Sequence, residues 1–323
     1  MWRGLSKFNN PEGFLGNERI VGALLRGIST GRFAHTLLFA GPAGSGKKSL
    51  AGFVVQRLFC PDSCQLCPNC TMLARGIHPD YLHIASEGSV KLEHARQLKE
   101  FLAAPPNTAA YKVALLEDCQ NLTVEAGNSL LKILEDPPQA SVCILTADSA
   151  DNVLPTLVSR SQVYTLAPLS REVISHALEK RNVPQQRSWF LAGFSQGVLG
   201  RALKLLEDED FWLRRQQMAT EIQEILARRR NPLQSSDNWQ VQPEEALDLL
   251  ESWLRDMLLS QINPDYIPVN RDLQSYLDAC MRNCPADKCI ALLDYCAAVR
   301  EYLQTRCNPR LVFDCLALKM WEV

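Results

Sequence analysis

The stretch "GPAGSGKKSL", residues 41–50, determines which fold class the sequence predicts. Gly41, Gly46 and Lys47 form the pattern Gly-x-x-x-x-Gly-Lys, and Gly44 lies inside it. Glycines let backbone N–H groups turn towards phosphate oxygens, and the lysine neutralises part of the phosphate charge. The pattern therefore predicts a phosphate-binding loop. The alternative is a glycine-rich turn at the start of a helix that binds no phosphate.

Apolar runs and helical patterns alternate around this loop. A short apolar run precedes the loop and a helical pattern (47–59) follows it, which is the context that phosphate-binding loops require. Short runs rich in β-branched or aliphatic residues are candidate buried strands: 36–40, 81–85, 113–116, 142–146 and 163–166. The stretches between them are long enough for crossover helices. The first half therefore predicts a parallel sheet in a doubly wound α/β domain.

The residue after the loop lysine departs from the pattern. A Ser or Thr there would bind the magnesium ion of a nucleotide, but the sequence has Lys48, whose ammonium group repels a divalent cation. Ser49 lies one residue further along the helix, rotated by about 100°, so it cannot simply substitute. Glu117 and Asp118 follow an apolar run, where one carboxylate would bind magnesium and the other would polarise the attacking water. The sequence thus keeps several parts of a nucleotide site but alters its magnesium position.

The second half of the chain is helical in pattern. After about residue 167 the strand patterns stop, and residues 170–181 predict a helix capped by Ser170. Residues 187–210 predict two helices with a break around Gly197 and Gly200. A polar stretch, 228–243, predicts an exposed loop that begins with three arginines. Such a short basic run is usually solvated, and contact with phosphate is the alternative.

A cysteine cluster, "CPDSCQLCPNC", spans residues 60–70. It places Cys60, Cys64, Cys67 and Cys70 at spacings of three, two and two residues. Four thiolates this close can bind one tetrahedral Zn²⁺, and a closed four-sulfur site has a structural role. An iron–sulfur cluster, a redox Cys-x-x-Cys pair and unliganded thiols are the alternatives.

The remaining cysteines lie in apolar surroundings and are predicted to be small core residues. They are Cys119, Cys143, Cys280, Cys284, Cys289, Cys296, Cys307 and Cys315. No histidine lies close enough in the sequence to Cys280, Cys284 and Cys289 to suggest a second metal site.

Composition limits the classes of function. A chain of 323 residues allows two or three domains, and its formal net charge of −2 gives no global attraction to nucleic acid or anionic lipid. Any contact with DNA must come from a local patch or from partner chains. No apolar run approaches the ~20 residues of a membrane span, and the first residues lack the apolar region of a signal peptide. The predicted compartment is the cytoplasm.

Taken together, six stretches resemble the clamp-loader subunits of bacterial DNA polymerase III, which are AAA+ proteins. They occur in the family's order and extend over nearly the whole chain: 14–47, 76–84, 112–138, 152–162, 195–206 and 308–318. Ser159-Arg160-Ser161 stands where the family has a Ser-Arg-Cys-type motif. In length and motif set the sequence is most similar to the delta-prime type.

The resemblance implies a domain organisation. It implies an AAA+ P-loop domain over residues 1–166 with a four-cysteine zinc module at 60–70, a helical lid over 167–207 and an all-helical collar over 208–323. It further implies a five-subunit ring, with delta and gamma/tau subunits as partners, that loads a sliding clamp onto primed DNA. No membrane is involved.

Residue roles follow from the same resemblance. In the family, the arginine at the position of Arg160 reaches the nucleotide of the neighbouring subunit, whereas without the motif it would be interpreted as a salt bridge at a domain boundary. Arg201 matches a second sensor arginine, with a solvated basic residue as the alternative. Glu117-Asp118 reverses the family's order of aspartate and glutamate, and Ala147 stands where a first sensor is usually polar.

The sequence therefore predicts a delta-prime-like subunit with weak or no intrinsic ATPase activity. ATP is a candidate ligand and zinc a predicted structural metal. The subunit would act mainly as a stator and as the donor of Arg160 in trans. The alternatives are an ATP-hydrolysing motor subunit of the gamma/tau type, and a stand-alone zinc- and nucleotide-binding protein that contacts nucleic acid.

Overall fold

The computed structural model describes residues 14–85, 88–305 and 307–322. The chain divides into two compact units. Unit 1 consists of Met1–Val173 and Gly197–Arg201, and unit 2 consists of Ile174–Gln196 and Ala202–Val323.

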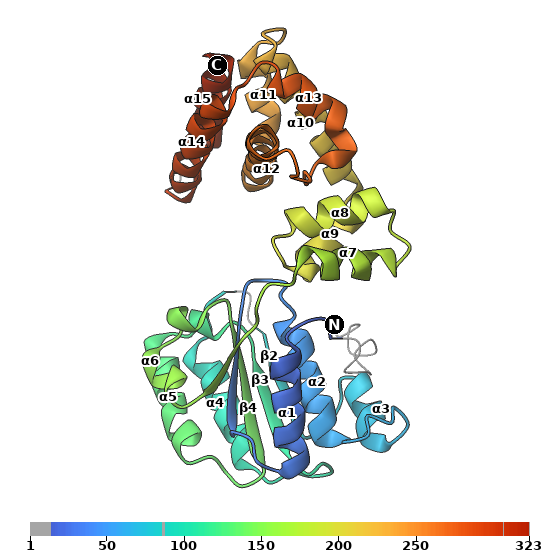
Figure 1. Ribbon diagram of the computed structural model, residues 1–323. Helices are drawn as coiled ribbons and strands as arrows, with labels where there is room; N and C mark the ends of the chain where they lie inside the picture. The colour runs from blue at the N-terminus through green and yellow to red at the C-terminus, as the bar shows by residue number, and fades with distance from the viewer. Residues whose placement is uncertain (1–13, 86–87, 306, 323) are drawn as a thin grey trace. The chain divides into compact units, whose positions relative to one another are not determined.

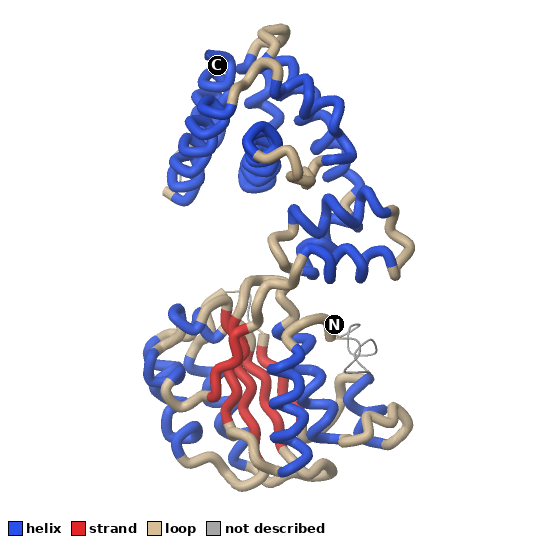
Figure 2. The backbone as a smooth tube through the Cα atoms, viewed as in Figure 1, coloured by secondary structure: helices blue, strands red, loops and turns tan. Residues whose placement is uncertain are grey.

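Unit 1 is built on a parallel sheet with the strand order β2-β3-β4-β1-β5 (Figures 1 and 2). The strands are β1 (Thr36–Ala40), β2 (Tyr81–Ile84), β3 (Lys112–Leu116), β4 (Ser141–Ala147) and β5 (Gln162–Thr165). Each predicted strand is confirmed to within one residue at either end. β1, β3 and β4 are buried along their whole length, as expected for strands covered on both faces.

Helices cover both faces of this sheet (Figure 1). The helical segments of unit 1 are α1 (Glu18–Thr30), α2 (Lys47–Phe59), α3 (Pro68–Ala74), α4 (Leu92–Ala103), η3 (Cys119–Asn121), α5 (Val124–Glu135), η4 (Ala150–Asn152) and α6 (Pro155–Val158). Leu37 and Phe39 belong to the core shared with α1 and α2, whereas Leu38 belongs to the core shared with α4 and α5. Alternate strand residues thus face opposite cores, and the doubly wound α/β prediction is confirmed.

The sheet register positions the candidate site. Ala40 is paired with Ala147, and Leu116 with Leu145, so the carboxyl ends of β1, β3 and β4 lie at the same edge of the sheet. The chain leaves these ends as the glycine-rich loop, as Glu117 and as the segment after Ala147. Ligand sites of open α/β sheets form at such an edge because the loops there converge.

Unit 2 is helical. Its segments include the greater part of α7 (Arg171–Glu179) and α9 (Leu199–Glu207), and all of α8 (Gln185–Phe194), α10 (Glu209–Leu226), α11 (Pro232–Trp239), α12 (Pro243–Ile262), η5 (Arg271–Leu273), α13 (Gln274–Met281), α14 (Ala286–Gln304) and α15 (Pro309–Glu322). The predicted cap of α7 is confirmed, because the backbone N–H of Val173 donates to Ser170 Oγ at 3.4 Å.

The two helices predicted over residues 187–210 are confirmed as α8 and α9. The break between them includes Gly197, whose φ of +83° favours glycine, whereas Gly200 lies inside α9. The prediction of an exposed loop further along this half was wrong. The expected loop at 228–243 contains the helix α11, with Asn231 as its N-cap and Trp239 buried. Its sequence, PLQSSDNW, has few aliphatic residues, so a pattern of apolar residues could not reveal it.

Cysteine burial agrees with the prediction at six of the eight remaining positions. Cys307 and Cys315 are exposed, so the prediction that these two are core residues was wrong. Cys315 lies on α15 and Cys307 just before it, where helical periodicity turns some positions to solvent.

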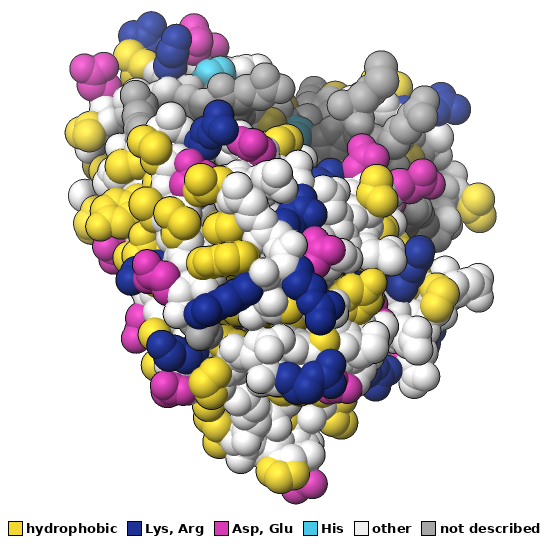
Figure 3. Space-filling model, turned by 90° about the horizontal axis from the view of Figure 1, so that it is seen from above, with side chains coloured by type: hydrophobic (Ala, Val, Ile, Leu, Met, Phe, Trp, Pro, Cys, Tyr) yellow, Lys and Arg dark blue, Asp and Glu magenta, His cyan; other side chains and the backbone are white. Residues whose placement is uncertain are grey.

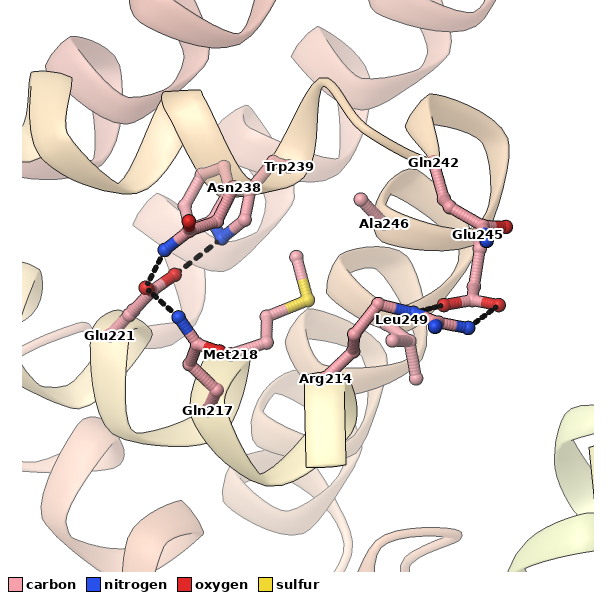
Figure 4. A pocket seen from close by; sticks show the side chains of 10 residues that line it. All are labelled: Arg214, Gln217, Met218, Glu221, Asn238, Trp239, Gln242, Glu245, Ala246 and Leu249. Carbon is pink, nitrogen blue, oxygen red and sulfur yellow. Dashed lines mark hydrogen bonds and ion pairs between the residues drawn. The ribbon is translucent and has the colours of Figure 1, made fainter. Parts of the chain in front are cut away.

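A buried carboxylate joins helices α10 and α11 of unit 2 (Figure 4). Glu221 on α10 accepts hydrogen bonds from Gln217 Nε2 at 3.1 Å, Asn238 Nδ2 at 2.6 Å and Trp239 Nε1 at 2.8 Å. It lies beside a pocket of about 40 Å³ between α10, α11 and α12. Since the partners of Glu221 satisfy its oxygens, we interpret it as a structural hub of the helical core.

The surface has no single charge character on the face drawn in Figure 3. Basic, acidic and hydrophobic side chains are intermingled there, in keeping with the formal net charge of −2. Among the described residues, no helix combines the length and the apolar character needed to cross a membrane.

Candidate functional site

The glycine-rich loop lies between β1 and α2 at the carboxyl edge of the sheet. Gly44 and Gly46 have φ values of +84° and +98°, which side chains rarely adopt, so both positions favour glycine. The N–H of Gly41 donates to the carbonyl of Ala147 at 3.1 Å and so fixes the start of the loop on β4. The backbone is therefore shaped as the sequence pattern requires.

Lys47 is held inside this loop. Its side chain is buried, and Nζ donates to the carbonyl of Gly41 and, at 3.1 Å, to that of Pro42. Burial lowers the pKa of Lys47, while the carboxylates of Asp118 and Asp148 act in the opposite direction. The ammonium group of Lys47, which would contact a phosphate, is thus hydrogen-bonded to loop carbonyls instead.

Lys48 forms an ion pair with Glu117. Lys48 Nζ contacts Glu117 Oε2, and the other oxygen, Oε1, lies 2.7 Å from His83 Nε2. The Glu117 side chain is 4% exposed and that of Lys48 64% exposed. Burial opposes ionisation of Glu117, but the contacts from His83 and Lys48 outweigh it and lower its pKa. The ammonium group of Lys48 therefore lies beside Glu117, the carboxylate that a magnesium site would use.

Asp118 is less enclosed than Glu117. It is half-buried with a φ of +50°, and its N–H donates to Thr146 Oγ1 at 3.2 Å. Ala147, the position where a polar sensor was expected, is a fully buried apolar residue, and the polar side chain at this end of β4 is Thr146. Thr146 was not identified from the sequence, because Ala147 alone was taken as the sensor position at the end of this strand.

Two further hydroxyls belong to the loop region. Ser49 is half-buried in the first turn of α2. The hydroxyl of Ser45 is buried and has no hydrogen-bond partner among the described residues. An unpartnered buried hydroxyl in a glycine-rich loop fits a phosphate oxygen, so the loop retains features that suit a nucleotide. Ser45 lies inside the sequence motif but was not singled out by it.

The segment Gly197–Arg201 closes over the loop. The N–H of Gly200 donates to the carbonyl of Gly44 at 3.1 Å. A Cβ atom at Gly200 would lie 2.6 Å from that carbonyl oxygen, so a side chain would force the two backbones apart. A Cβ atom at Gly44 would lie 3.3 Å from the backbone nitrogen of Arg201. Arg201, a predicted site residue, is therefore next to the phosphate loop.

Arg160 lies apart from that loop, between α6 and β5. Its Nε donates to Glu135 Oε1 at 2.7 Å, and Nη2 contacts the same oxygen. Nη1 donates to the carbonyl of Thr156 at 3.0 Å and to Ser159 Oγ at 3.3 Å. The side chain of Arg160 is 32% exposed and that of Glu135 51% exposed. The guanidinium therefore lies at the surface and is held by its own chain; Glu135 was not identified from the sequence.

The four clustered cysteines converge. Their Sγ atoms lie within 4.8 Å of one another, and those of Cys60 and Cys64 are 3.6 Å apart. Zinc–sulfur bonds of about 2.3 Å in a tetrahedron place sulfurs about 3.8 Å apart, so this donor set fits one zinc ion. Backbone N–H groups point at the sulfurs, from Cys64 to Cys60 Sγ at 3.5 Å and from Cys67 to Cys64 Sγ at 3.4 Å. Donors of this kind stabilise thiolate ligands.

A histidine and an aspartate connect the cysteine module to the sheet. His78 stacks on Phe59 with ring centroids 4.2 Å apart, and its Nε2 lies 3.3 Å from Asn69 Oδ1. Asp80 is fully buried and accepts hydrogen bonds from the N–H groups of residues 107–109 at 2.7 to 2.9 Å. Burial opposes ionisation of Asp80, but these donors outweigh it and hold its pKa well below the usual value. The segment 76–84 is thus a structural connection.

Comparison with known proteins agrees with this architecture. A sequence model of the family described as "DNA polymerase III, delta subunit" matches residues 16–170. The DNA polymerase III subunit delta' of Bacillus subtilis is 27% identical over 268 residues, which cover 79% of this chain and 81% of the relative. The DNA polymerase III subunit gamma of Buchnera aphidicola subsp. Schizaphis graminum is 29% identical over 211 residues, which cover 61% of this chain and 58% of the relative.

The tau subunit of Escherichia coli is 32% identical over 170 residues, which are 51% of this chain and 26% of that protein. Among solved structures, a DNA polymerase III gamma subunit-related protein of Thermotoga maritima is 18% identical, with a TM-score of 0.42 and coverage of 94% of this chain and 98% of that one. A TM-score of that size adds nothing to the assignment.

The five-stranded parallel sheet with a phosphate loop after β1, followed by helices, defines an α/β protein of the P-loop type. Within that class, residues 16–170 match the DNA polymerase III delta-subunit family model, and the chain is similar to DNA polymerase III subunits of the delta', gamma and tau types.

Proposed function

We propose that this chain is a delta-prime-type subunit that acts mainly as a stator and hydrolyses little or no ATP itself. The observation that supports this most is the ion pair between Lys48 and Glu117. A magnesium ion near Glu117 would have to displace an ammonium group already paired with that carboxylate, and would be repelled by it. The metal-dependent part of hydrolysis is therefore weakened while the fold is kept.

Nucleotide binding itself is compatible with the loop. Lys47, the Ser45 hydroxyl and the loop N–H groups would hold the phosphates, and Arg201 would lie nearby. Bound ATP would supply a γ-phosphate for transfer to water. For Lys47 to serve it, its Nζ must leave the carbonyls of Gly41 and Pro42. We propose that binding is weak and depends little on magnesium.

Arg160 is proposed to act on the nucleotide of a neighbouring subunit. Its side chain is partly exposed to solvent and is not part of the core of its own chain. A group that acts on a neighbouring subunit must be accessible in this way. An arginine supplied in this way can raise a neighbour's hydrolysis rate by about 10³-fold or more, because it stabilises charge that develops on the transferred phosphoryl group. The proposed partners are delta and gamma/tau subunits, with the sliding clamp and primed DNA reached through the complex in the cytoplasm.

Zinc at Cys60, Cys64, Cys67 and Cys70 is proposed to be structural. The sulfurs can complete a tetrahedron by themselves, which leaves no open position for a substrate. The ion would tie the start of α3 to the end of α2.

An ATPase assay on the purified chain tests the stator proposal. We expect turnover at the background level, with and without primed DNA. A variant with Lys47→Ala is the control, because it removes the loop lysine. Brisk turnover that disappears in this variant would overturn the proposal and favour the motor type, to which the matches with gamma and tau subunits also correspond.

Reconstitution tests the role of Arg160. The chain is mixed with delta and gamma/tau subunits, assembly is followed by size-exclusion chromatography, and the ATPase rate of the complex is measured. Arg160→Ala is expected to leave assembly intact and to slow hydrolysis at the adjoining site by about 10³-fold. Arg75→Ala, an exposed arginine after α3, is the matched control. An unchanged rate in the Arg160→Ala complex would refute the finger role.

A further inference from the structure

An open groove of about 410 Å³ lies in unit 2, remote in sequence from the phosphate loop and from Arg160. Two separated segments line it, the connection between α10 and α11 and the last turns of α15. Its lining includes Arg228, Arg229, Arg230, Leu233, Leu318 and Trp321, and we call it the basic groove. The tertiary fold thus places the arginine run beside an indole ring.

The backbone at Arg228 has an unusual conformation for this residue. Its φ is +56°, in the left-handed region that glycine normally occupies at the end of a helix. The N–H of Arg228 donates to the carbonyl of Ile225 at 2.9 Å, and that of Arg229 to Glu224 at 2.8 Å, which is the hydrogen-bond pattern of a Schellman motif. The chain therefore carries an arginine where glycine would be easier, a departure typical of functional positions.

Arg230 has a different role from its two neighbours. Its Nη2 lies 3.2 Å from Glu221 Oε1 and its Nη1 3.3 Å from Glu224 Oε2. Glu221 is buried, so this arginine is anchored to the helical core and fixes the connection in place. Arg228 and Arg229 are exposed, and in the part of the chain that the structure describes neither guanidinium has an ion pair.

Other charged groups near the groove are paired. Glu224 is paired with Arg230, and Glu322 lies 3.3 Å from Lys319 Nζ. The positive charges of Arg228 and Arg229 are therefore uncompensated on the side of the connection between α10 and α11. Trp321 is half-buried and lines the groove.

From this arrangement we propose that the basic groove binds single-stranded nucleic acid, with Arg228 and Arg229 on backbone phosphates and an unpaired base stacked on Trp321. Two guanidiniums beside an aromatic ring is the combination that single-strand sites use. A duplex fits less well, because its bases are already stacked and cannot reach an indole in a concave site. The proposal is independent of the phosphate loop and of Arg160, so neither role depends on the other.

Fluorescence anisotropy with the full chain tests the proposal. The probe is labelled oligothymidylate of about ten nucleotides, and the comparison probes are a duplex of the same length and an oligoglutamate peptide. We expect the single strand to bind at least tenfold more tightly than the duplex, and the peptide not to compete. The slope of log K against log salt should be about −1.4, since each single-strand phosphate contact contributes about −0.7.

Variants identify the groove. Arg228→Gly with Arg229→Gln should reduce affinity about tenfold and bring the salt slope close to zero, while the melting temperature is unchanged or raised because glycine suits the left-handed position. Trp321→Leu should weaken binding about tenfold through loss of stacking. Arg310→Gln is the control, since Arg310 is an exposed arginine of α15 that pairs with Asp237 outside the groove.

Three results would overturn the proposal. They are equal affinity for duplex and single strand, displacement of the single strand by the acidic peptide at similar concentration, and binding that survives the Arg228→Gly, Arg229→Gln double variant. Absence of measurable binding by the intact chain at low salt would do the same.

Discussion

Lys48 and Glu117 are joined by an ion pair at the carboxyl edge of the sheet, between the first turn of α2 and the end of β3. Glu117 is buried and keeps a lowered pKa despite that burial, because His83 and Lys48 both contact its oxygens. The lysine that departs from the phosphate-loop pattern thus has a defined structural partner. Its ammonium group is a covalently attached cation beside the carboxylate that a magnesium site would use.

Replacing Lys48 by threonine should reverse this arrangement. The variant offers a hydroxyl for magnesium and removes the repelling charge, so we expect nucleotide binding to become dependent on Mg²⁺. A fluorescent ATP analogue titrated with and without Mg²⁺ measures this, with an expected gain of about tenfold in the presence of the ion. Lys48→Met removes the charge without adding a ligand, and should show no such gain. Strong Mg²⁺-dependent binding by the unaltered chain would contradict the interpretation.

The pair between Arg160 and Glu135 should restrain the proposed finger. Nε, Nη1 and Nη2 of Arg160 are all engaged with its own chain, so contact with a neighbour's phosphate requires part of this set to be released. An exposed ion pair contributes about 0–1 kcal/mol, so Glu135→Gln should raise the ATPase rate of the reconstituted complex by up to about fivefold. A lower rate in the Glu135→Gln complex would mean that Glu135 presents Arg160 rather than restrains it.

Removal of zinc should destabilise the cysteine module. Treatment with a thiol-modifying reagent in the presence of a chromogenic zinc indicator should release about one ion per chain. Cys60→Ser should weaken zinc retention, because its sulfur is one of four that converge within 4.8 Å. Cys307→Ser is the matched control, since Cys307 is an exposed cysteine outside the cluster. A brown protein containing iron, or full zinc retention after Cys60→Ser, would argue against the predicted site.

Asp80 should make stability depend on acidic pH. Its folded-state pKa lies below the value of about 3.9 in an unfolded chain, so its contribution to the free energy of unfolding is present above pH 4 and is lost as the pH falls below it. Asp80→Asn should lower stability at pH 7 by about 1–3 kcal/mol, because buried N–H donors lose a charged acceptor. The difference from the unaltered chain should shrink towards pH 3.

Urea unfolding at pH 7 and at pH 3 measures this difference. Asp62→Asn is the control, because Asp62 is an exposed aspartate of the cysteine module. An equal loss of stability at both pH values for Asp80→Asn would show that the charge of Asp80 does not carry the effect.

Local patterns in the sequence predicted the sheet and the phosphate loop well. The strands of unit 1 are continuous apolar runs because both sheet faces are covered, and such runs are recognised without knowing their neighbours. Gly44 and Gly46 were likewise identifiable, because their left-handed backbone conformation favours glycine and glycines can be read directly from the sequence. Helix α11 was missed because its buried face is made of serines and a tryptophan rather than aliphatic residues.

By itself, the sequence determined the α/β fold class, the phosphate-loop backbone, the cysteine cluster and the departure from the phosphate-loop pattern at Lys48. Only the tertiary structure decided which partners the charged residues have. Glu117 for Lys48, Glu135 for Arg160 and Trp321 beside the arginine run all come from segments distant in the chain. The physical reason is that backbone conformation depends largely on neighbouring residues, whereas a charge takes its partner from whichever segments the packed core brings within hydrogen-bond distance.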